Sequence, residues 1–226
     1  MVDRELIELS QQLKQVEEKG FAQFKIEEED LPYLISNLGT VRAQYDGNEC
    51  GFVEYNYKSE GLYSASSTGE LEFHTECTEF DEAPPKYLLL YCIHPCERGG
   101  VTKLLNLSSF FESLPEKDKN VVGNEAIEFG STPGLLADKG FVQSSVYPIF
   151  SAKKNCFRFS KKCMNYESSD ELVSIINKFD KFSEENFIGI KLEKGDVLIW
   201  NNHLLAHSRT SYVDKKRKLK RYWIND

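Results

Sequence analysis

Apolar residues at the start of the chain follow the spacing of an amphipathic helix. Over residues 3–19 they recur every three or four positions, so one stripe of the helix would be apolar. Gly20 follows at a place where helices commonly end. The pattern predicts a helix that covers a larger body with the stripe Leu6, Leu9, Leu13 and Val16.

Beyond residue 20 the pattern changes to short apolar runs separated by turn sequences. Residues 41–69 are rich in tyrosine and turn signals, which predicts strands and loops around the mouth of a site. Ser168-Ser169-Asp170-Glu171 is typical of a capping box before a helix. The predicted strands cover residues 21–26, 70–78, 87–93, 126–129, 142–150, 156–159 and 219–224, and the predicted helices cover residues 30–38, 108–118 and 170–182.

Two apolar runs near the C-terminus flank a turn sequence. Residues 187–192 and 197–200 lie on either side of Glu193-Lys194-Gly195-Asp196. Strands joined by so short a turn commonly pair with each other, so this pattern predicts a β-hairpin.

These elements indicate a mainly β fold with flanking helices, a β-sandwich or jelly roll. A doubly wound α/β fold fits poorly, because strands and helices do not alternate and no glycine-rich turn follows a strand. The 226 residues suffice for one well-buried domain. We expect a single domain over 1–226, with a helical N-terminal cover over 1–40 and a jelly-roll core with helical insertions over 41–226.

Composition excludes several classes of function. A net charge of −8 and a pI near 5.2 argue against a general binder of nucleic acid or of anionic membranes. No apolar run approaches the length of a membrane span, and the charged N-terminus does not resemble a signal peptide. The six cysteines contain no C-x-x-C pair, which predicts free thiols in a reducing compartment and hence a cytoplasmic protein.

The candidate chemistry begins with His74 and Glu76. On an extended strand, residues two apart point to the same face, so an imidazole and a carboxylate would lie side by side. This is two-thirds of the 2-His-1-carboxylate triad that binds non-haem Fe(II) and leaves coordination positions open. The third ligand stays open at this point, because spacing does not choose among His94, His203 and His207.

Further motifs follow His74-Thr75-Glu76 in order, and together they resemble the taurine dioxygenase/clavaminate synthase-like family over about residues 38–224. Members are Fe(II)/2-oxoglutarate-dependent oxygenases built on a double-stranded β-helix, a jelly-roll core. The motifs are Pro84-Pro85, Gly99-Gly100-Val101-Thr102, Gly195-Asp196-Val197-Leu198-Ile199-Trp200-Asn201-Asn202, His207-Ser208-Arg209 and Arg217-Lys218-Leu219-Lys220-Arg221.

The resemblance implies a role for each matching residue. The family's distal metal ligand follows the asparagine of its W-D-N signature by five positions, which selects His207 rather than His203 or His94. Thr102 and Arg217 match the residues that bind 2-oxoglutarate, and Arg221 matches an arginine that in several relatives reaches the substrate's acidic group. Arginine suits both tasks, because its planar fork binds a carboxylate through two hydrogen bonds.

The chain departs from the family pattern in three respects. Most members have aspartate at the position of Glu76, although the clavaminate synthase branch also has glutamate there. Asn201 replaces the usual aspartate of the W-D-N signature. The chain is also short for the family, which suggests trimmed lid insertions.

The implied activity is oxidation, most simply hydroxylation, of an unactivated C–H bond in a small polar molecule. Fe(II) would be the cofactor and O2 and 2-oxoglutarate the co-substrates, with release of succinate and CO2. An amino acid or related carboxylate is the favoured substrate, because Arg221 would serve as an anion clamp. The alternative is a catalytically silent jelly roll that binds a ligand or a partner.

Two competing interpretations were weighed. The basic run at residues 215–221 could be a nuclear-localisation or nucleic-acid patch, but the chain is acidic and has no second basic cluster. On a strand, Arg217, Leu219 and Arg221 would face inward and leave Lys218 and Lys220 in solvent. A zinc deaminase would carry H-x-E followed by P-C-x-x-C, and the second cysteine is missing after Pro95-Cys96.

Overall fold

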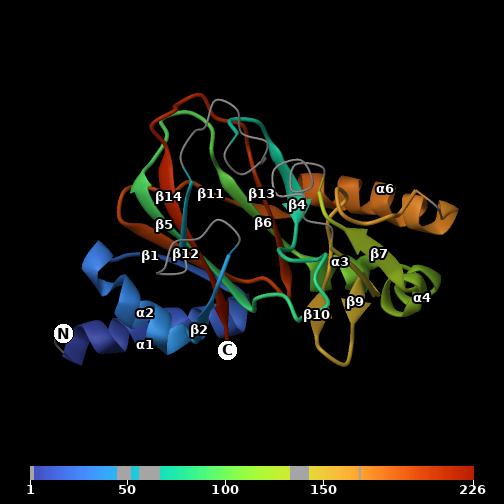
Figure 1. Cartoon of the computed structure of the whole chain (residues 1–226), viewed down its shortest axis with the longest axis horizontal. Coiled ribbons are helices and arrows are strands. Elements are labelled where there is room, and N and C mark those ends of the chain that lie inside the picture. The colour runs from blue at the N-terminus through green and yellow to red at the C-terminus, as the bar shows by residue number, and fades with distance from the viewer. Residues whose placement is uncertain (1–2, 45–51, 56–66, 133–142, 168) are drawn as a thin grey trace.

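The computed structural model describes residues 3–44, 52–55, 67–132, 143–167 and 169–226. Two antiparallel sheets form its centre (Figure 1). The larger sheet has the order β1-β12-β5-β14-β2, with β3 also paired to β14. Its strands are β1 (Phe21–Lys25), β12 (Asp196–Asn201), β5 (Tyr87–His94), β14 (Lys218–Asn225), β2 (Thr40–Arg42) and β3 (Phe52–Tyr55). The smaller sheet has the order β11-β6-β13-β4, with strands Phe187–Ile190, Thr102–Asn106, Leu205–Arg209 and Leu71–His74.

Alternating side chains on the strands build a core on each face of the larger sheet. On β5, Leu88 and Leu90 point towards the smaller sheet, whereas Leu89 and Tyr91 point to the opposite face. The inner core contains Leu104 of β6 and is completed by side chains of β11, β12, β13 and β14. This arrangement of two facing sheets confirms the predicted mainly β fold with a jelly-roll core.

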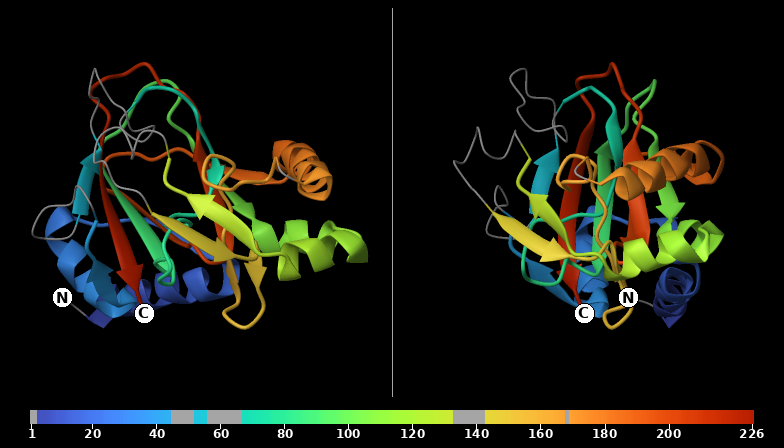
Figure 2. Two further views of the ribbon diagram at one scale, coloured as in Figure 1. Left: turned by 45° about the vertical axis from the view of Figure 1, so that its right-hand side comes forward. Right: turned by 90° about the vertical axis from the view of Figure 1, so that its right-hand side faces the viewer.

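Helices cover both outer faces of this sandwich. Helices α1 (Asp3–Lys19) and α2 (Leu31–Leu38) pack against the larger sheet, and a 3-10 turn, Glu28–Asp30, precedes α2. Helices α3 (Leu107–Ser113), α4 (Glu116–Asn124) and α6 (Asp170–Glu185) lie at the opposite end of the molecule (Figure 2). Together with the short pairs β7–β8 (Ile127–Gly130, Ser144–Tyr147) and β9–β10 (Phe150–Ser151, Cys156–Phe157), they enclose a third core against the smaller sheet.

The predicted hairpin over residues 187–200 is wrong. Strand β11 pairs with β6, whereas β12 pairs with β1 and β5 in the other sheet. The turn itself forms as expected: Asp196 accepts the Glu193 amide at 2.9 Å, and Gly195 has a positive φ of 82°. Strand β12 is buried along almost its whole length, whereas β11 buries only Ile190. The turn therefore joins one strand of each sheet instead of closing a hairpin.

The N-terminal segment does more than cover the core. Within residues 1–40, β1 pairs with β12 as an edge strand of the larger sheet. Leu9, Leu13 and Val16 of the predicted stripe pack as expected: Val16 is only 2% exposed, and Leu9 and Leu13 are partly buried. The side chain of Leu6 lies outside the described part of the structure. The proposed boundary at residue 40 therefore separates helices from strands only approximately.

The helix expected over residues 108–118 is two helices. Pro115 lacks an amide proton and holds Leu114 in an extended conformation, so α3 ends and α4 begins there. The cap of α3 is Asn106, which accepts the Ser109 amide at 3.0 Å, rather than a serine. The predicted cap of α6 is confirmed, since Ser169 accepts the Leu172 amide at 3.3 Å, and that helix continues to Glu185.

The thiol prediction is confirmed where the structure describes it. Cys77, Cys92, Cys96, Cys156 and Cys163 are free, and Cys50 lies outside the described residues. The segment 41–69, expected around the mouth of the site, also lies partly outside them. Among the described helices, none has the length and apolarity needed to cross a membrane.

Candidate active site

Three side chains that the sequence singled out meet at one end of the smaller sheet. His74 on β4 and His207 on β13 are register partners on adjacent strands, and their ring centroids are 4.1 Å apart. Glu76 Oε2 lies 3.4 Å from His74 Nε2 and 3.7 Å from His207 Nε2. Two bonds of about 2.1 Å at right angles would place ligand atoms ~3 Å apart, so this donor set fits a metal ion with a slight contraction.

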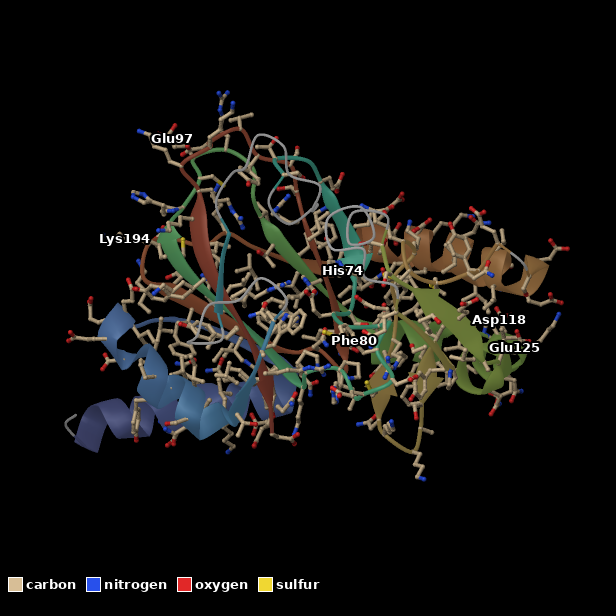
Figure 3. The ribbon with its side chains drawn as sticks, viewed as in Figure 1. His74, Phe80, Glu97, Asp118, Glu125 and Lys194 are labelled. Atoms are coloured by element: carbon tan, nitrogen blue, oxygen red, sulfur yellow. The ribbon has the colours of Figure 1, made fainter. Side chains whose placement is uncertain are left out.

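Glu76 reaches this position from a turn, not from a strand. Strand β4 ends at His74, and Thr75 is fixed by a 2.7 Å bond from its amide to the carbonyl of Phe159. The Thr75 hydroxyl also accepts the Phe159 amide at 3.0 Å. The expected extended strand through residue 78 is therefore wrong, although the two side chains do lie side by side (Figure 3 labels His74).

Both imidazoles are suited to bind a metal through Nε2. His74 Nδ1 lies 2.8 Å from the carbonyl oxygen of Glu72, and because a carbonyl only accepts, Nδ1 carries the proton. Nε2 is then the ring nitrogen left to coordinate a metal, and it is the one nearer to Glu76. Burial and the neighbouring His74 hold the pKa of His207 well below its usual value, so its ring is neutral. Neutral imidazole is the form that coordinates metals.

Arg221 binds the side of the carboxylate that faces away from the histidines. Its Nη1 contacts Glu76 Oε1, and its Nε donates to Gln44 Oε1 at 3.0 Å. Burial opposes the charge on Glu76, yet Arg221 and His74 hold the pKa of its carboxyl well below the usual range. Glu76 is therefore ionised, with one oxygen paired to Arg221 and the other presented to the histidines.

Arg217 is a buried cation directly before β14, the strand that carries Arg221. It is 5% exposed, and its guanidinium lies 5.1 Å from the centre of the Tyr212 ring. In the described ranges, no carboxylate lies within ion-pairing distance of it. Gly100 leaves room for it, because a Cβ there would lie 3.2 Å from Arg217 Nε and 2.3 Å from Cys96 Sγ.

Thr102 is brought near the triad by strand register. It begins β6, is 3% exposed and pairs with Arg209 of β13. Leu104, two positions further along β6, pairs with His207. Thr102 therefore lies on the strand next to His207, two positions before Leu104, the register partner of His207.

The basic run behaves partly as expected. Leu219 is buried between the sheets, and Arg221 points to Glu76. Lys220 lies on the other face, but it pairs with Glu28 and its side chain is only 14% exposed. The prediction that Lys218 and Lys220 are left in solvent is wrong, because both are half-buried and the N-terminal segment packs over that face.

Sequence reasoning missed two residues that contact the loop carrying Glu76. Asn202 served only as a reference point for counting to His207, and Arg158 was not noticed. Asn202 is 0% exposed and binds the main chain of Glu76, while Arg158 is 4% exposed and binds the segment that follows. The signature around Asn202 was a usable signal, whereas nothing in the sequence marks Arg158.

The other two histidines lie outside the metal cluster. His94 is exposed at the end of β5. His203 Nε2 lies 2.9 Å from the carbonyl oxygen of Pro84, to which it donates, and burial lowers the pKa of its imidazole. His203 is thus a structural residue that ties the turn after β12 to the loop before β5.

Because of His203, we expect the metal-free protein to lose stability in mild acid. His203 stays neutral in the fold, whereas the unfolded chain takes up a proton below about pH 6.5, so stability falls as the pH drops through that value by at most ~1.4 kcal/mol per pH unit. In His203→Gln the amide keeps the bond to Pro84 without titrating. Denaturation at pH 7.5 and 5.5 should show a smaller loss for the variant, and an equal loss would contradict this role.

Comparisons with known proteins point to one enzyme family. The family model described as "Taurine catabolism dioxygenase TauD, TfdA family" matches residues 3–223. A uridine-5'-phosphate dioxygenase of Streptomyces sp is 24% identical over 95% of this chain and 87% of its own, and one of Amycolatopsis sp is 25% identical over 66% and 58%.

Solved structures share the fold. An asparagine oxygenase in complex with Fe(II), 3-hydroxyasparagine and succinate superposes with a TM-score of 0.79 at 11% identity, covering 96% of this chain and 78% of that one. The non-haem iron oxygenase OrfP, in complex with Fe, succinate and (3S)-hydroxy-L-Arg, gives 0.77 at 14% identity, covering 99% and 82%. Since the family model spans nearly the whole sequence, the chain belongs to the TauD/TfdA family of Fe(II)- and 2-oxoglutarate-dependent dioxygenases.

Proposed function

We propose that His74, Glu76 and His207 bind the Fe(II) of this dioxygenase, and that the enzyme hydroxylates a C–H bond of a small anionic molecule. The observation that carries the assignment is the convergence of three ligand atoms, all within 4.8 Å of one another among the described residues. When bound, Fe(II) supplies the redox chemistry in which O2 and 2-oxoglutarate yield succinate, CO2 and an oxidised substrate.

The protein's own residues bind and orient the reactants. Arg217 would pair with the far carboxylate of 2-oxoglutarate, because a buried cation without an acidic partner is costly until an anion arrives. Thr102 would contribute a hydroxyl to the same co-substrate from the start of β6. Glu76 contributes one negative charge to the proposed site, and the neutral His207 contributes none. A bound Fe(II) would therefore keep part of its positive charge, which favours an anionic chelator.

For the substrate we propose an amino acid or a related carboxylate. Arg221 places positive charge beside Glu76 at the metal ligands, where an anionic group of the substrate would be attracted. The solved asparagine oxygenase and OrfP structures contain hydroxylated amino acids, which supports this class. A nucleoside 5'-phosphate is the second candidate, because a uridine-5'-phosphate dioxygenase aligns with 95% of the chain.

Succinate release across a substrate panel separates these possibilities. The panel contains free amino acids, including asparagine and arginine, and nucleoside 5'-monophosphates, each with Fe(II), 2-oxoglutarate and O2. We expect one class to raise succinate release above the substrate-free rate and to gain one oxygen atom by mass spectrometry. Absence of both succinate release and iron binding with every compound would instead support a silent binding protein.

A further inference from the structure

Asn202 is a fully buried amide behind the carboxylate ligand. It lies directly after β12, and its side chain is 0% exposed. Its Oδ1 accepts the amide of Glu76 at 2.8 Å, and its Nδ2 donates to the carbonyl oxygens of Pro85 at 3.0 Å and of Glu76 at 3.3 Å. One side chain therefore binds both polar main-chain groups of Glu76, and it uses donor and acceptor at once.

Arg158 is a buried cation that binds carbonyl groups instead of an acid. Its Nη1 donates to the carbonyl oxygen of Thr78 at 2.8 Å and to that of Phe80, and its Nη2 donates to that of Glu82 at 2.8 Å. The ring of Tyr147 covers the guanidinium, with its centroid at 4.1 Å. In the part of the chain that the structure describes, no carboxylate pairs with Arg158.

These two side chains converge on residues 75–82, which we call the carboxylate loop. The loop contains no helix or strand, so no ladder of main-chain hydrogen bonds fixes it. Cys77 within it has a φ of 62°, a conformation that side chains other than glycine rarely adopt. His74 and Phe80, at the two ends of the turn, lie near the middle of the molecule (Figure 3). Apart from the main-chain bond from the Thr75 amide to Phe159, the loop is held by side chains from distant parts of the chain.

We propose that Asn202 and Arg158 are positioning residues for Glu76. They hold the carboxylate loop so that one oxygen of Glu76 already faces the metal site when the metal is absent. They act through the main chain and do not touch the metal. This inference rests on the proposed role of Glu76 as a metal ligand. Substitution of groups that orient a metal ligand in this way commonly lowers metal affinity by about 10–100-fold.

The chemistry of Asn202 makes a conservative substitution informative. An aspartate has the same shape and can still accept the Glu76 amide, but it places an oxygen against the carbonyls of Glu76 and Pro85, where two donated bonds are lost. The neighbouring Asn201 is the matched control. Its Oδ1 only accepts the His203 amide, at 2.9 Å, which an aspartate also does.

The experiment titrates Co(II) alone into the full-length, metal-free protein and measures the free energy of unfolding of the same samples. We expect Asn202→Asp to weaken Co(II) binding by about 10–100-fold while the protein stays folded, and Asn201→Asp to bind Co(II) within about twofold of the unsubstituted protein. A purely structural role would lower stability but leave the Co(II) affinity of the folded protein unchanged.

Arg158→Lys keeps the test decisive if Asn202→Asp does not fold. A single ammonium group reaches fewer of the four loop carbonyls that Arg158 binds, so Co(II) affinity should fall in the same direction by a smaller factor. Folded Asn202→Asp or Arg158→Lys protein that binds Co(II) as tightly as the unsubstituted protein overturns the proposal. Failure of the unsubstituted protein to bind Co(II) would instead contradict the proposed metal site itself.

Discussion

Replacing Glu76 with glutamine is expected to abolish iron binding and succinate release together. The amide keeps the shape of the side chain, but it removes the only carboxylate among the three proposed ligands, and with it the negative charge that attracts the metal ion. The substitution also leaves the Arg221 guanidinium, buried beside it, without its anionic partner. Bound iron after desalting and succinate release by the same preparation measure the two losses.

The control for this substitution is Glu72→Gln on β4, the strand that ends just before Glu76. Its side chain is 47% exposed and pairs with Lys161, so it should retain both iron and activity. A Glu76→Gln enzyme that kept full iron content and turnover would show that this carboxylate is not a ligand. Loss of activity with iron retained would restrict Glu76 to orienting the substrate.

Replacing Arg217 with methionine is expected to weaken 2-oxoglutarate binding by at least about 30-fold. Truncating one partner of a buried charge pair typically costs about 2–5 kcal/mol, and 2 kcal/mol corresponds to roughly 30-fold in affinity. The metal-free protein should show the opposite trend in stability. Because no acid in the described ranges pairs with Arg217, an apolar side chain of similar length removes a buried charge and should leave the free energy of unfolding unchanged or higher.

The neighbouring Lys216→Met serves as the control, because Lys216 is exposed in the same basic run. The Michaelis constant for 2-oxoglutarate and denaturant unfolding without metal give the two readouts. An unchanged Michaelis constant in Arg217→Met would contradict the co-substrate role. A large loss of stability in the metal-free variant would show that Arg217 serves the fold instead.

Much of the site could be predicted from the sequence because its ligands lie in local motifs. His74 and Glu76 are two residues apart, so local pattern carried that pair, whereas His207 was selected by the family resemblance through its spacing from the W-D-N signature. The extended strand predicted for the first pair is nonetheless wrong. Glu76 lies in a turn whose course depends on Phe159 and Asn202, which are distant in sequence. Residues that act through such contacts, Arg158 above all, leave no local trace.

The fold was predictable to the same depth. Continuous apolar runs in β5 and β12 indicate buried strands, and capping at Ser169 indicates a helix start, because both are local effects. Strand pairing is not local. The turn at Gly195 looks like a hairpin turn, yet the strands on either side of it join different sheets: β11 pairs with β6, and β12 pairs with β1 and β5.

The central claim is that His74, Glu76 and His207 form one iron site that also receives 2-oxoglutarate. The most direct measurement is an anaerobic titration of the metal-free protein with Fe(II) and then 2-oxoglutarate, followed by visible absorption. We predict one iron per chain and the weak charge-transfer band of the iron–keto-acid chelate, with both absent in His207→Ala. A His207→Ala protein that binds iron and gives the same band would contradict the claim, as would an unsubstituted protein that gives no band.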